Sequence, residues 1–332
     1  MIAFTARGRA LGSRVQEVMP TTQWRVYDKT REDAKTWTSR EFYACDAFIF
    51  IGATGIAVRL IAPFLQNKAQ DPAVVVMDER GHFVISLVSG HLGGANALTA
   101  ELSARLDAVP VITTATDING VWAVDMWAAQ NTCVVANPTA IKPISAALLN
   151  GEKVGVASDF PVQSALPQGL FWANSGALGI SLSFDTDHAP FTVTLNLVPK
   201  IVVLGAGCRK NTPFGDFEMA VRQMLAQCRI WPQALRTLAS IDLKREEPCF
   251  IEFAHHYRLA FETFSAKALN AAAGDFNGSD FVKSATGTDN VCERAAVLAS
   301  GGRLIYGKTV RNGITLALAV PDWQCDFNME RS

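Results

Sequence analysis

The chain has 332 residues, of which 49% are hydrophobic and 18% charged, so it is long enough for two domains and can bury large cores. The 30 lysines and arginines balance 31 aspartates and glutamates, which argues against bulk electrostatic binding of nucleic acid or a membrane surface. Seven scattered cysteines without a CxxC pair indicate reduced thiols, and no apolar run is long enough to span a membrane. The N-terminal residues do not have the order of a secretory signal. We therefore expect a cytoplasmic globular protein that binds neither nucleic acid nor membrane.

Short β-branched runs alternate with helical patterns in the first half of the chain. Apolar residues recur at helical spacing over residues 56–65 and 95–106. Five runs have the length of strands: residues 2–6, 47–51, 73–77, 84–88 and 109–113. This alternation predicts a largely parallel sheet covered by helices.

The pattern weakens over residues 131–200, where turn signals dominate and only short strand-like pieces occur, such as residues 178–184 and 191–197. It then starts again with a strand that leads into a glycine turn. The later elements are a strand at 201–204, a helix at 213–228, a helix at 290–298, and strands at 304–306 and 314–320.

These patterns predict an α/β fold with two α/β lobes, in which mainly parallel sheets are flanked by helices and a smaller middle segment joins the lobes. We place the N-terminal domain at residues 1–128, the middle segment at 129–199 and the C-terminal domain at 200–332.

Three loops rich in glycine and polar residues follow predicted strands of the first lobe. They are GATG at residues 52–55, SGHLGGAN at 89–96 and TTATD at 113–117. Ligands of open parallel sheets bind outside the carboxyl ends of the strands, so we expect the three loops to meet at one edge. Each loop can equally be a tight turn that needs glycine, and His91 a turn or cap residue. Neither GxxxxGK[ST] nor a GxGxxG after the first strand occurs, which argues against a nucleotide site.

The second lobe opens with GAGCRKNT at residues 205–212. Arg209 and Lys210 are suited to holding carboxylates. Cys208 beside these two cations is either a nucleophile with a lowered pKa or, as we favour, a small packed residue. His255 and His256 are adjacent on a predicted helix and cannot form an i,i+4 metal pair, so we interpret them as structural.

The long run from GATG to TTATD is very similar to the N-terminal part of the CbiG family of cobalamin biosynthesis, the cobalt-precorrin-5A hydrolases. LGAGCRKNTP and TGTDNVCERAAVLASGG resemble motifs of the C-terminal part of that family. The likeness is dense over residues 46–117 and sparser over 201–320. Gly307 departs from the family, which usually has proline before the lysine of this segment.

The resemblance implies a hydrolase that opens the ring A lactone of cobalt-precorrin-5A with water, releases the C20 fragment as acetaldehyde and gives cobalt-precorrin-5B. The partner is then a small-molecule cobalt corrinoid that carries its own metal, so we expect no cofactor and no metal held by protein ligands. The oligomeric state stays open, with a homodimer as one option. Two other functions also stay open, a non-catalytic carrier of tetrapyrrole intermediates and, more weakly, a nucleotide-dependent transferase.

For lactone hydrolysis we give His91 the role of general base and acid, with Asp117 orienting it or sharing the proton. Backbone amides of Gly93 and Gly94, or of Thr54 and Gly55, would stabilise the oxyanion, and the sequence does not choose between them. A competing mechanism uses Cys208 as a covalent nucleophile. The predicted catalytic residues are His91, Asp117, Ser89 and Asn96. The predicted substrate-binding residues are Gly52, Thr54, Gly55, Arg59, Gly93, Gly94, Thr114, Thr116, Cys208, Arg209, Lys210, Thr286 and Glu293.

Overall fold

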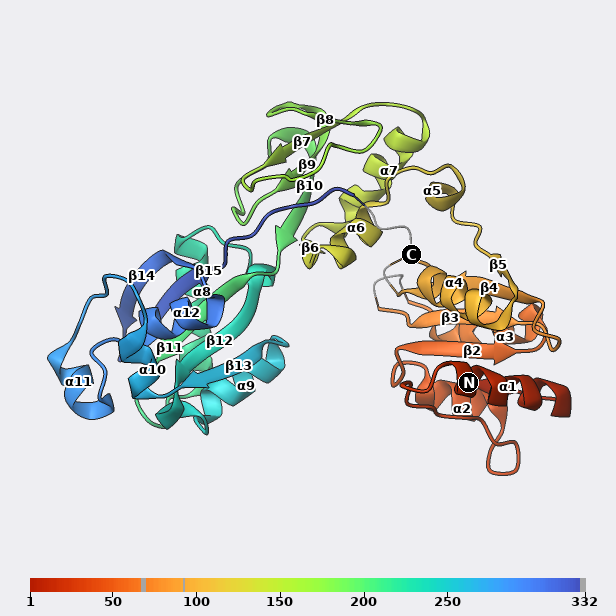
Figure 1. Cartoon of the computed structure of the whole chain (residues 1–332), viewed down its shortest axis with the longest axis horizontal. Coiled ribbons are helices and arrows are strands. Elements are labelled where there is room, and N and C mark those ends of the chain that lie inside the picture. The colour runs from red at the N-terminus through yellow and green to blue at the C-terminus, as the bar shows by residue number, and fades with distance from the viewer. Residues whose placement is uncertain (67–69, 92, 329–332) are drawn as a thin grey trace. The chain divides into compact units, whose positions relative to one another are not determined.

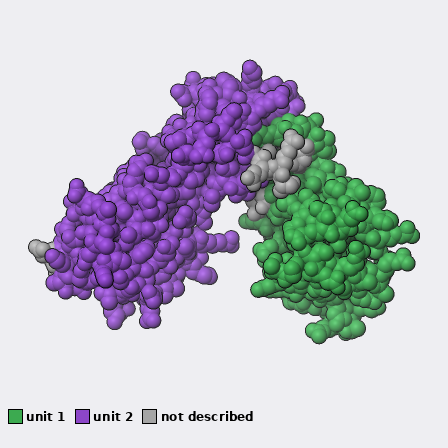
Figure 2. Space-filling model, in the orientation of Figure 1, with its two compact units in different colours: residues 1–126, 330–332 green, residues 127–329 purple. Residues whose placement is uncertain are grey.

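Three five-stranded sheets follow one another along the chain in the computed structural model (Figure 1). The structure describes residues 1–66, 70–91 and 93–328, without the side chains of residues 116, 117, 280 and 281. Residues 1–126 form a first compact unit, and a second unit starts at Trp127 (Figure 2). Unit 1 holds the first sheet, and unit 2 holds the other two. Because each sheet combines parallel strands with covering helices, the predicted α/β class is confirmed.

The first sheet combines both strand directions. Strands β1, β2 and β3 are parallel, β4 is antiparallel to β3, and β5 is parallel to β4. In spatial order the strands are β1 (Ile2–Ala3), β2 (Ala47–Ile51), β3 (Ala73–Met77), β4 (Phe83–Val88) and β5 (Val109–Val111).

Helices cover both faces of this sheet, which is why its central strands are apolar at every position. Ile49 and Ile51 pack in one core with the helices of one face, whereas Phe48 and Phe50 pack in another core on the opposite face. The first face carries α1 (Ala6–Val18) and α4 (Ala95–Leu106), and the second carries α2 (Ala34–Glu41) and α3 (Thr54–Ile61). The 3-10 helix η1 (Ala62–Phe64) follows α3, and α5 (Ala115–Ile118) and the start of α6 (Val124–Gln130) complete unit 1.

The reversed direction of β4 divides the predicted loops between two edges of the first sheet. Strands β1, β2 and β3 end at one edge, which we call the Gly52 edge. Strands β4 and β5 end at the opposite edge, which we call the His91 edge. The prediction that all three loops meet at one edge is therefore wrong, because it assumed that β4 runs parallel to its neighbours.

The second sheet gives the middle segment more regular structure than the sequence indicated. Its order is β6-β10-β9-β7-β8, and only β6 is antiparallel to its neighbour. Strands β9 and β10 correspond to the two predicted strand-like pieces. The elements are β6 (Cys133–Val135), the 3-10 helix η2 (Pro138–Ala140), α7 (Ile141–Leu149), β7 (Val154–Ser158), β8 (Leu170–Trp172), β9 (Gly176–Leu182) and β10 (Phe191–Pro199).

The third sheet has the order β13-β12-β11-β15-β14, in which β11, β12 and β13 are parallel and β15 is antiparallel to β11. Its strands are β11 (Val202–Gly207), β12 (Leu235–Ile241), β13 (Ala260–Phe264), β14 (Arg303–Arg311) and β15 (Ile314–Val320). Helices α8 (Phe214–Gln227) and α9 (Pro248–His256) contribute to the core on one face, and α10 (Ala266–Ala271) and α12 (Cys292–Ser300) to the core on the other. The remaining elements are α11 (Asp280–Thr286) and the 3-10 helices η3 (Pro232–Ala234) and η4 (Asp242–Lys244).

After β15 the chain returns to the start of unit 2. Cys325 forms a parallel bridge with Val162, and the Phe327 ring stacks on Trp127 with 4.9 Å between ring centroids. The Trp127 indole also donates a hydrogen bond to the carbonyl of Asp326 at 2.7 Å. The last described residues thus pack outside the third sheet. Among the helices of the described chain, none combines the length and apolar composition needed to cross a bilayer.

Candidate active site

The loop after β4 is compact because glycines allow parts of it to pack closely. A β-carbon at Gly93 would overlap the Ser89 β-carbon and lie 2.9 Å from the Ser89 carbonyl oxygen. Gly94 has a φ of 83°, a left-handed conformation that favours glycine, and directly precedes α4. Its amide donates to the His91 carbonyl at 3.0 Å, while the Ala95 amide donates to the Ser89 carbonyl at 3.1 Å. The loop therefore holds His91 at the start of α4 by its own backbone.

His91 pairs with Asp125. The His91 Nδ1 lies 2.9 Å from the Asp125 Oδ1, and 8% of each side chain is exposed. Asp125 lies in the first turn of α6, and the same oxygen accepts a hydrogen bond from the Met126 amide at 3.1 Å. A buried carboxylate that accepts the Nδ1 proton of a histidine leaves Nε2 able to take a proton, which is the arrangement used in general base catalysis.

Asn96 joins the two loops of the His91 edge. Its side-chain oxygen accepts a hydrogen bond from the Ser86 hydroxyl at 2.6 Å, and its amide donates to the Thr114 hydroxyl at 3.1 Å. Asn96 is buried, so these bonds satisfy polar atoms away from water. They position the loop after β5 against the loop after β4. The Ser89 hydroxyl is buried as well and has no hydrogen-bond partner in the described part of the chain.

The third segment at the His91 edge is the connection from α3 to β3, in place of the predicted GATG loop. Asp71, just before β3, is buried and accepts hydrogen bonds from the Tyr43 hydroxyl at 3.2 Å and the Gln66 amide at 3.0 Å. A β-carbon at Gly93 would lie 3.2 Å from the Asp71 carbonyl oxygen, so Asp71 lies against the loop of His91.

Several predicted site residues of unit 1 lie elsewhere or outside the description. Gly52, Thr54 and Gly55 lie at the Gly52 edge, where α3 begins without a side-chain cap. Arg59 is exposed in the last turn of α3. The chain after α3 returns to the His91 edge, because β3 starts at that edge. Thr116 and Asp117 belong to α5, and their side chains lie outside the described residues.

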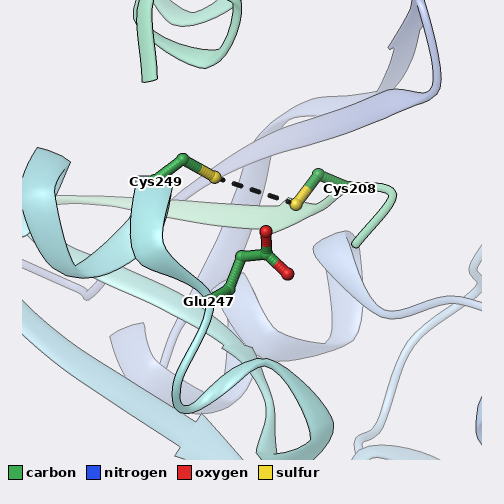
Figure 3. A group of neighbouring side chains, drawn as sticks. All are labelled: Cys208, Glu247 and Cys249. Carbon is green, nitrogen blue, oxygen red and sulfur yellow. Dashed lines mark hydrogen bonds between the residues drawn. The ribbon is translucent and has the colours of Figure 1, made fainter. Parts of the chain in front are cut away.

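In the third sheet, the loops after the neighbouring parallel strands β11 and β12 bring together three side chains that are far apart in sequence. The Cys208 sulfur lies 4.0 Å from the Cys249 sulfur, and a Glu247 carboxylate oxygen lies within 4.8 Å of both (Figure 3). Arg209 and Lys210 follow Cys208, and both are exposed.

Glu293 and Thr286 have partners within their own domain. Glu293 is buried at the start of α12, where one carboxylate oxygen accepts from the Lys308 amide at 2.6 Å. The other accepts from the Asn277 amide at 3.1 Å and from the Asn290 side chain. The Thr286 hydroxyl bonds to the carbonyls of residues 282 and 288. Both side chains hold the ends of their segments in place, and their roles toward a substrate stay predictions.

An α/β domain with a buried histidine–carboxylate pair at the carboxyl ends of its strands belongs to the class of proteins that can move protons at a ligand bound outside the sheet. Three family models match the chain: Cobalamin synthesis G N-terminal at residues 36–117, Cobalamin biosynthesis central region at 122–199 and Cobalamin synthesis G C-terminus at 202–319. A protein of Salmonella typhimurium named cobalt-precorrin-5A hydrolase is 38% identical, over 96% of this chain and 97% of its own. The chain therefore belongs to the cobalamin synthesis G family.

A protein of Priestia megaterium, also named cobalt-precorrin-5A hydrolase, is 32% identical over 84% of this chain and 79% of its own. The crystal structure of a cobalamin biosynthesis protein G homolog from Sulfolobus solfataricus is 23% identical, covers 96% of both chains and gives a TM-score of 0.42.

Sequence reasoning missed Asp125, Glu247 and Cys249. Asp125 carried a usable signal, since WAVDMW places one carboxylate inside an apolar run where burial and a partner are expected. Glu247 and Cys249 carried no local signal, because their site depends on β12 lying beside β11.

Proposed function

We infer that the protein is a cobalt-precorrin-5A hydrolase, which opens the ring A lactone with water and releases the C20 fragment as acetaldehyde to give cobalt-precorrin-5B. Membership of the family supports this function along almost the whole chain, and two relatives that match most of the chain bear the name of this enzyme. The single observation that carries the inference is the 38% identity to such a hydrolase across 96% of the chain.

For the chemistry we propose that His91 activates water. Its Nδ1–H donates to Asp125, so Nε2 takes a proton from the water that attacks the lactone carbonyl. The acyl carbon–oxygen bond then breaks, and the imidazolium returns the proton to the leaving oxygen. The 2.9 Å contact with a buried carboxylate supports this role, since a nearby negative charge stabilises the imidazolium formed on the way.

For the developing oxyanion we propose donors at the His91 edge and not the amides of Thr54 and Gly55, which lie at the opposite edge. The Gly94 amide already donates to the His91 carbonyl. The Thr114 hydroxyl accepts from Asn96, which leaves its own proton to donate to a substrate oxygen. Thr114 is therefore the donor that we place beside the reacting carbonyl.

We further propose that Arg59, Arg209 and Lys210 bind peripheral carboxylates of the substrate, because all three are exposed cations next to predicted loops. The cobalt belongs to the substrate, and the lactone step as written uses no cofactor of the protein. A cytoplasmic location is supported by seven cysteines that are all unpaired by disulfides in the structure.

The test is anaerobic incubation of the purified protein with cobalt-precorrin-5A, with a carbonyl reagent trapping acetaldehyde while the mass of the macrocycle is followed. We expect acetaldehyde in step with the mass change, and its loss in His91→Asn. His82→Asn is the matched control, because His82 is exposed in the turn between β3 and β4 of the same sheet. Tight binding without acetaldehyde would contradict the enzyme and favour a carrier.

The competing covalent route through Cys208 is distinguished by rapid acid quenching and mass spectrometry of the protein. Water attack leaves the protein mass unchanged during turnover. An acyl adduct on the Cys208 peptide would overturn our assignment of His91 as the base that activates water.

A further inference from the structure

The cluster of Cys208, Glu247 and Cys249 lies where loops converge at the carboxyl ends of parallel strands. Cys208 directly follows β11, and the other two follow β12 and the short helix η4. One ligand atom of each residue lies within 4.8 Å of the others, and the two sulfurs face each other above the carboxylate (Figure 3). Side chains that are 41 residues apart are thus brought to one point by the sheet.

Glu247 provides a second, independent observation. Its side chain is only 3% exposed, and one carboxylate oxygen forms an ion pair with the Lys244 ammonium, from which it accepts a hydrogen bond at 2.7 Å. The other oxygen, Oε1, is buried without a hydrogen-bond partner among the described residues. An unpaired buried carboxylate oxygen costs about 1–3 kcal/mol or more, so a carboxylate that keeps such an oxygen and lies beside two thiols favours a positive partner.

The spacing of the sulfurs is too long for a disulfide and is compatible with a shared cation. A disulfide needs the sulfurs about 2.05 Å apart, whereas they lie 4.0 Å apart. Two sulfurs bound tetrahedrally to zinc at about 2.3 Å would lie about 3.8 Å from each other, close to the observed distance. A carboxylate would also disfavour the thiolate that starts disulfide formation, but it would favour a bound cation.

The charges of the cluster balance around a divalent cation. Two thiolates and one carboxylate carry three negative charges, and a divalent cation with the Lys244 ammonium carries three positive charges. Buried charges are tolerated when they are paired or bound to metal.

We propose that Cys208, Cys249 and Glu247 form a binding site for a thiophilic divalent cation of the zinc class, with a fourth position left for water or another ligand. This site departs from the sequence-based expectation of no protein-held metal. It is separate from the hydrolytic step, which we derive from His91 without it. Its test therefore uses metal binding and not turnover.

The experiment uses the full chain, stripped of metal with a chelator under reducing, anaerobic conditions. Cobalt(II) is titrated as the spectroscopic probe, and zinc is then added. We expect an intense sulfur-to-cobalt charge-transfer band that saturates at one equivalent and disappears when zinc displaces cobalt.

Three variants locate the site. Cys249→Ser loses the charge-transfer band of the cysteine pair, and Glu247→Gln, which keeps the shape of the side chain, weakens binding about tenfold or more. Cys228→Ser is the matched control, because Cys228 is a half-buried free cysteine of the same unit outside the cluster. Near-ultraviolet circular dichroism checks that each variant is folded. If Cys249→Ser does not fold, the affinity of Glu247→Gln for the metal still tests the proposal.

Three results would overturn the proposal. The first is the absence of a band at one equivalent in the reduced parent protein. The second is an unchanged band in Cys249→Ser, which would place the metal elsewhere. The third is unchanged affinity in a folded Glu247→Gln, which would show that the buried carboxylate does not face the cation.

Discussion

Replacing Asp125 by asparagine removes the charge beside His91 while keeping the size of the side chain. The two side chains are 2.9 Å apart at their closest atoms and 8% exposed, so water screens their interaction only weakly. With charge centres about 4 Å apart and an effective dielectric of about 20, the carboxylate stabilises an imidazolium by about 4 kcal/mol. Since about 1.4 kcal/mol corresponds to a tenfold change in rate, we expect acetaldehyde release to slow by about 10³-fold.

The assay compares single-turnover acetaldehyde release by the parent protein, Asp125→Asn and Asp107→Asn. Asp107 is an exposed residue at the end of α4 with a φ of 57°, a conformation that asparagine also tolerates. We expect Asp107→Asn to keep the parent rate, and both variants to keep the parent circular dichroism spectrum. A folded Asp125→Asn that is slowed less than about fivefold, corresponding to about 1 kcal/mol, would refute the role of the pair in proton transfer.

Three further predictions concern stability, each measured by urea unfolding. Gly93→Ala places a methyl group where it overlaps the Ser89 β-carbon, so we expect it to lower the free energy of unfolding of unit 1 by about 2–3 kcal/mol. An unchanged free energy of unfolding would show that the loop can relax. The hydrogen bond from Arg25 lowers the pKa of Glu41 in the folded protein. The ionised Glu41 side chain therefore stabilises the fold fully above its unfolded pKa of about 4.3, and this stabilisation is lost as pH falls through the lower pKa of the folded state. Glu41→Gln should therefore cost about 1–3 kcal/mol at neutral pH and progressively less below pH 4, whereas a pH-independent loss would contradict this cause. Phe327→Ala should destabilise unit 2 by about 3–5 kcal/mol, because its ring is 1% exposed and stacks on Trp127; a loss below about 1 kcal/mol would mean that the C-terminal segment does not stabilise the unit.

The sequence predicted the strands that are buried on both faces, because short, continuous apolar runs such as residues 47–51 and 73–77 are typical of strands with helices on both sides. It did not predict strand direction. Only residues 78–82 separate β3 from β4, and a parallel connection needs a dozen or more, so this short link was the available signal for an antiparallel pair. Missing it placed the GATG loop and the loop of His91 at the same edge of the sheet.

The candidate active site could be predicted from the sequence only in part, for a related reason. His91 stands in a glycine-rich loop that local patterns single out, but its partner lies 34 residues further along the chain. Asp125 reaches the histidine from α6, and no local pattern pairs these two residues. The pairing depends on how α6 packs, which is tertiary information.

The stacking of Trp127 on Phe327 places the two ends of unit 2 next to each other. A short linker could therefore close this unit into a ring, and new termini could be opened at an exposed turn elsewhere, as in other domains whose ends adjoin. Unit 2 thus meets the geometric condition for circular permutation. In such a permutant the third sheet could precede the second in chain order, without changing which strands are paired.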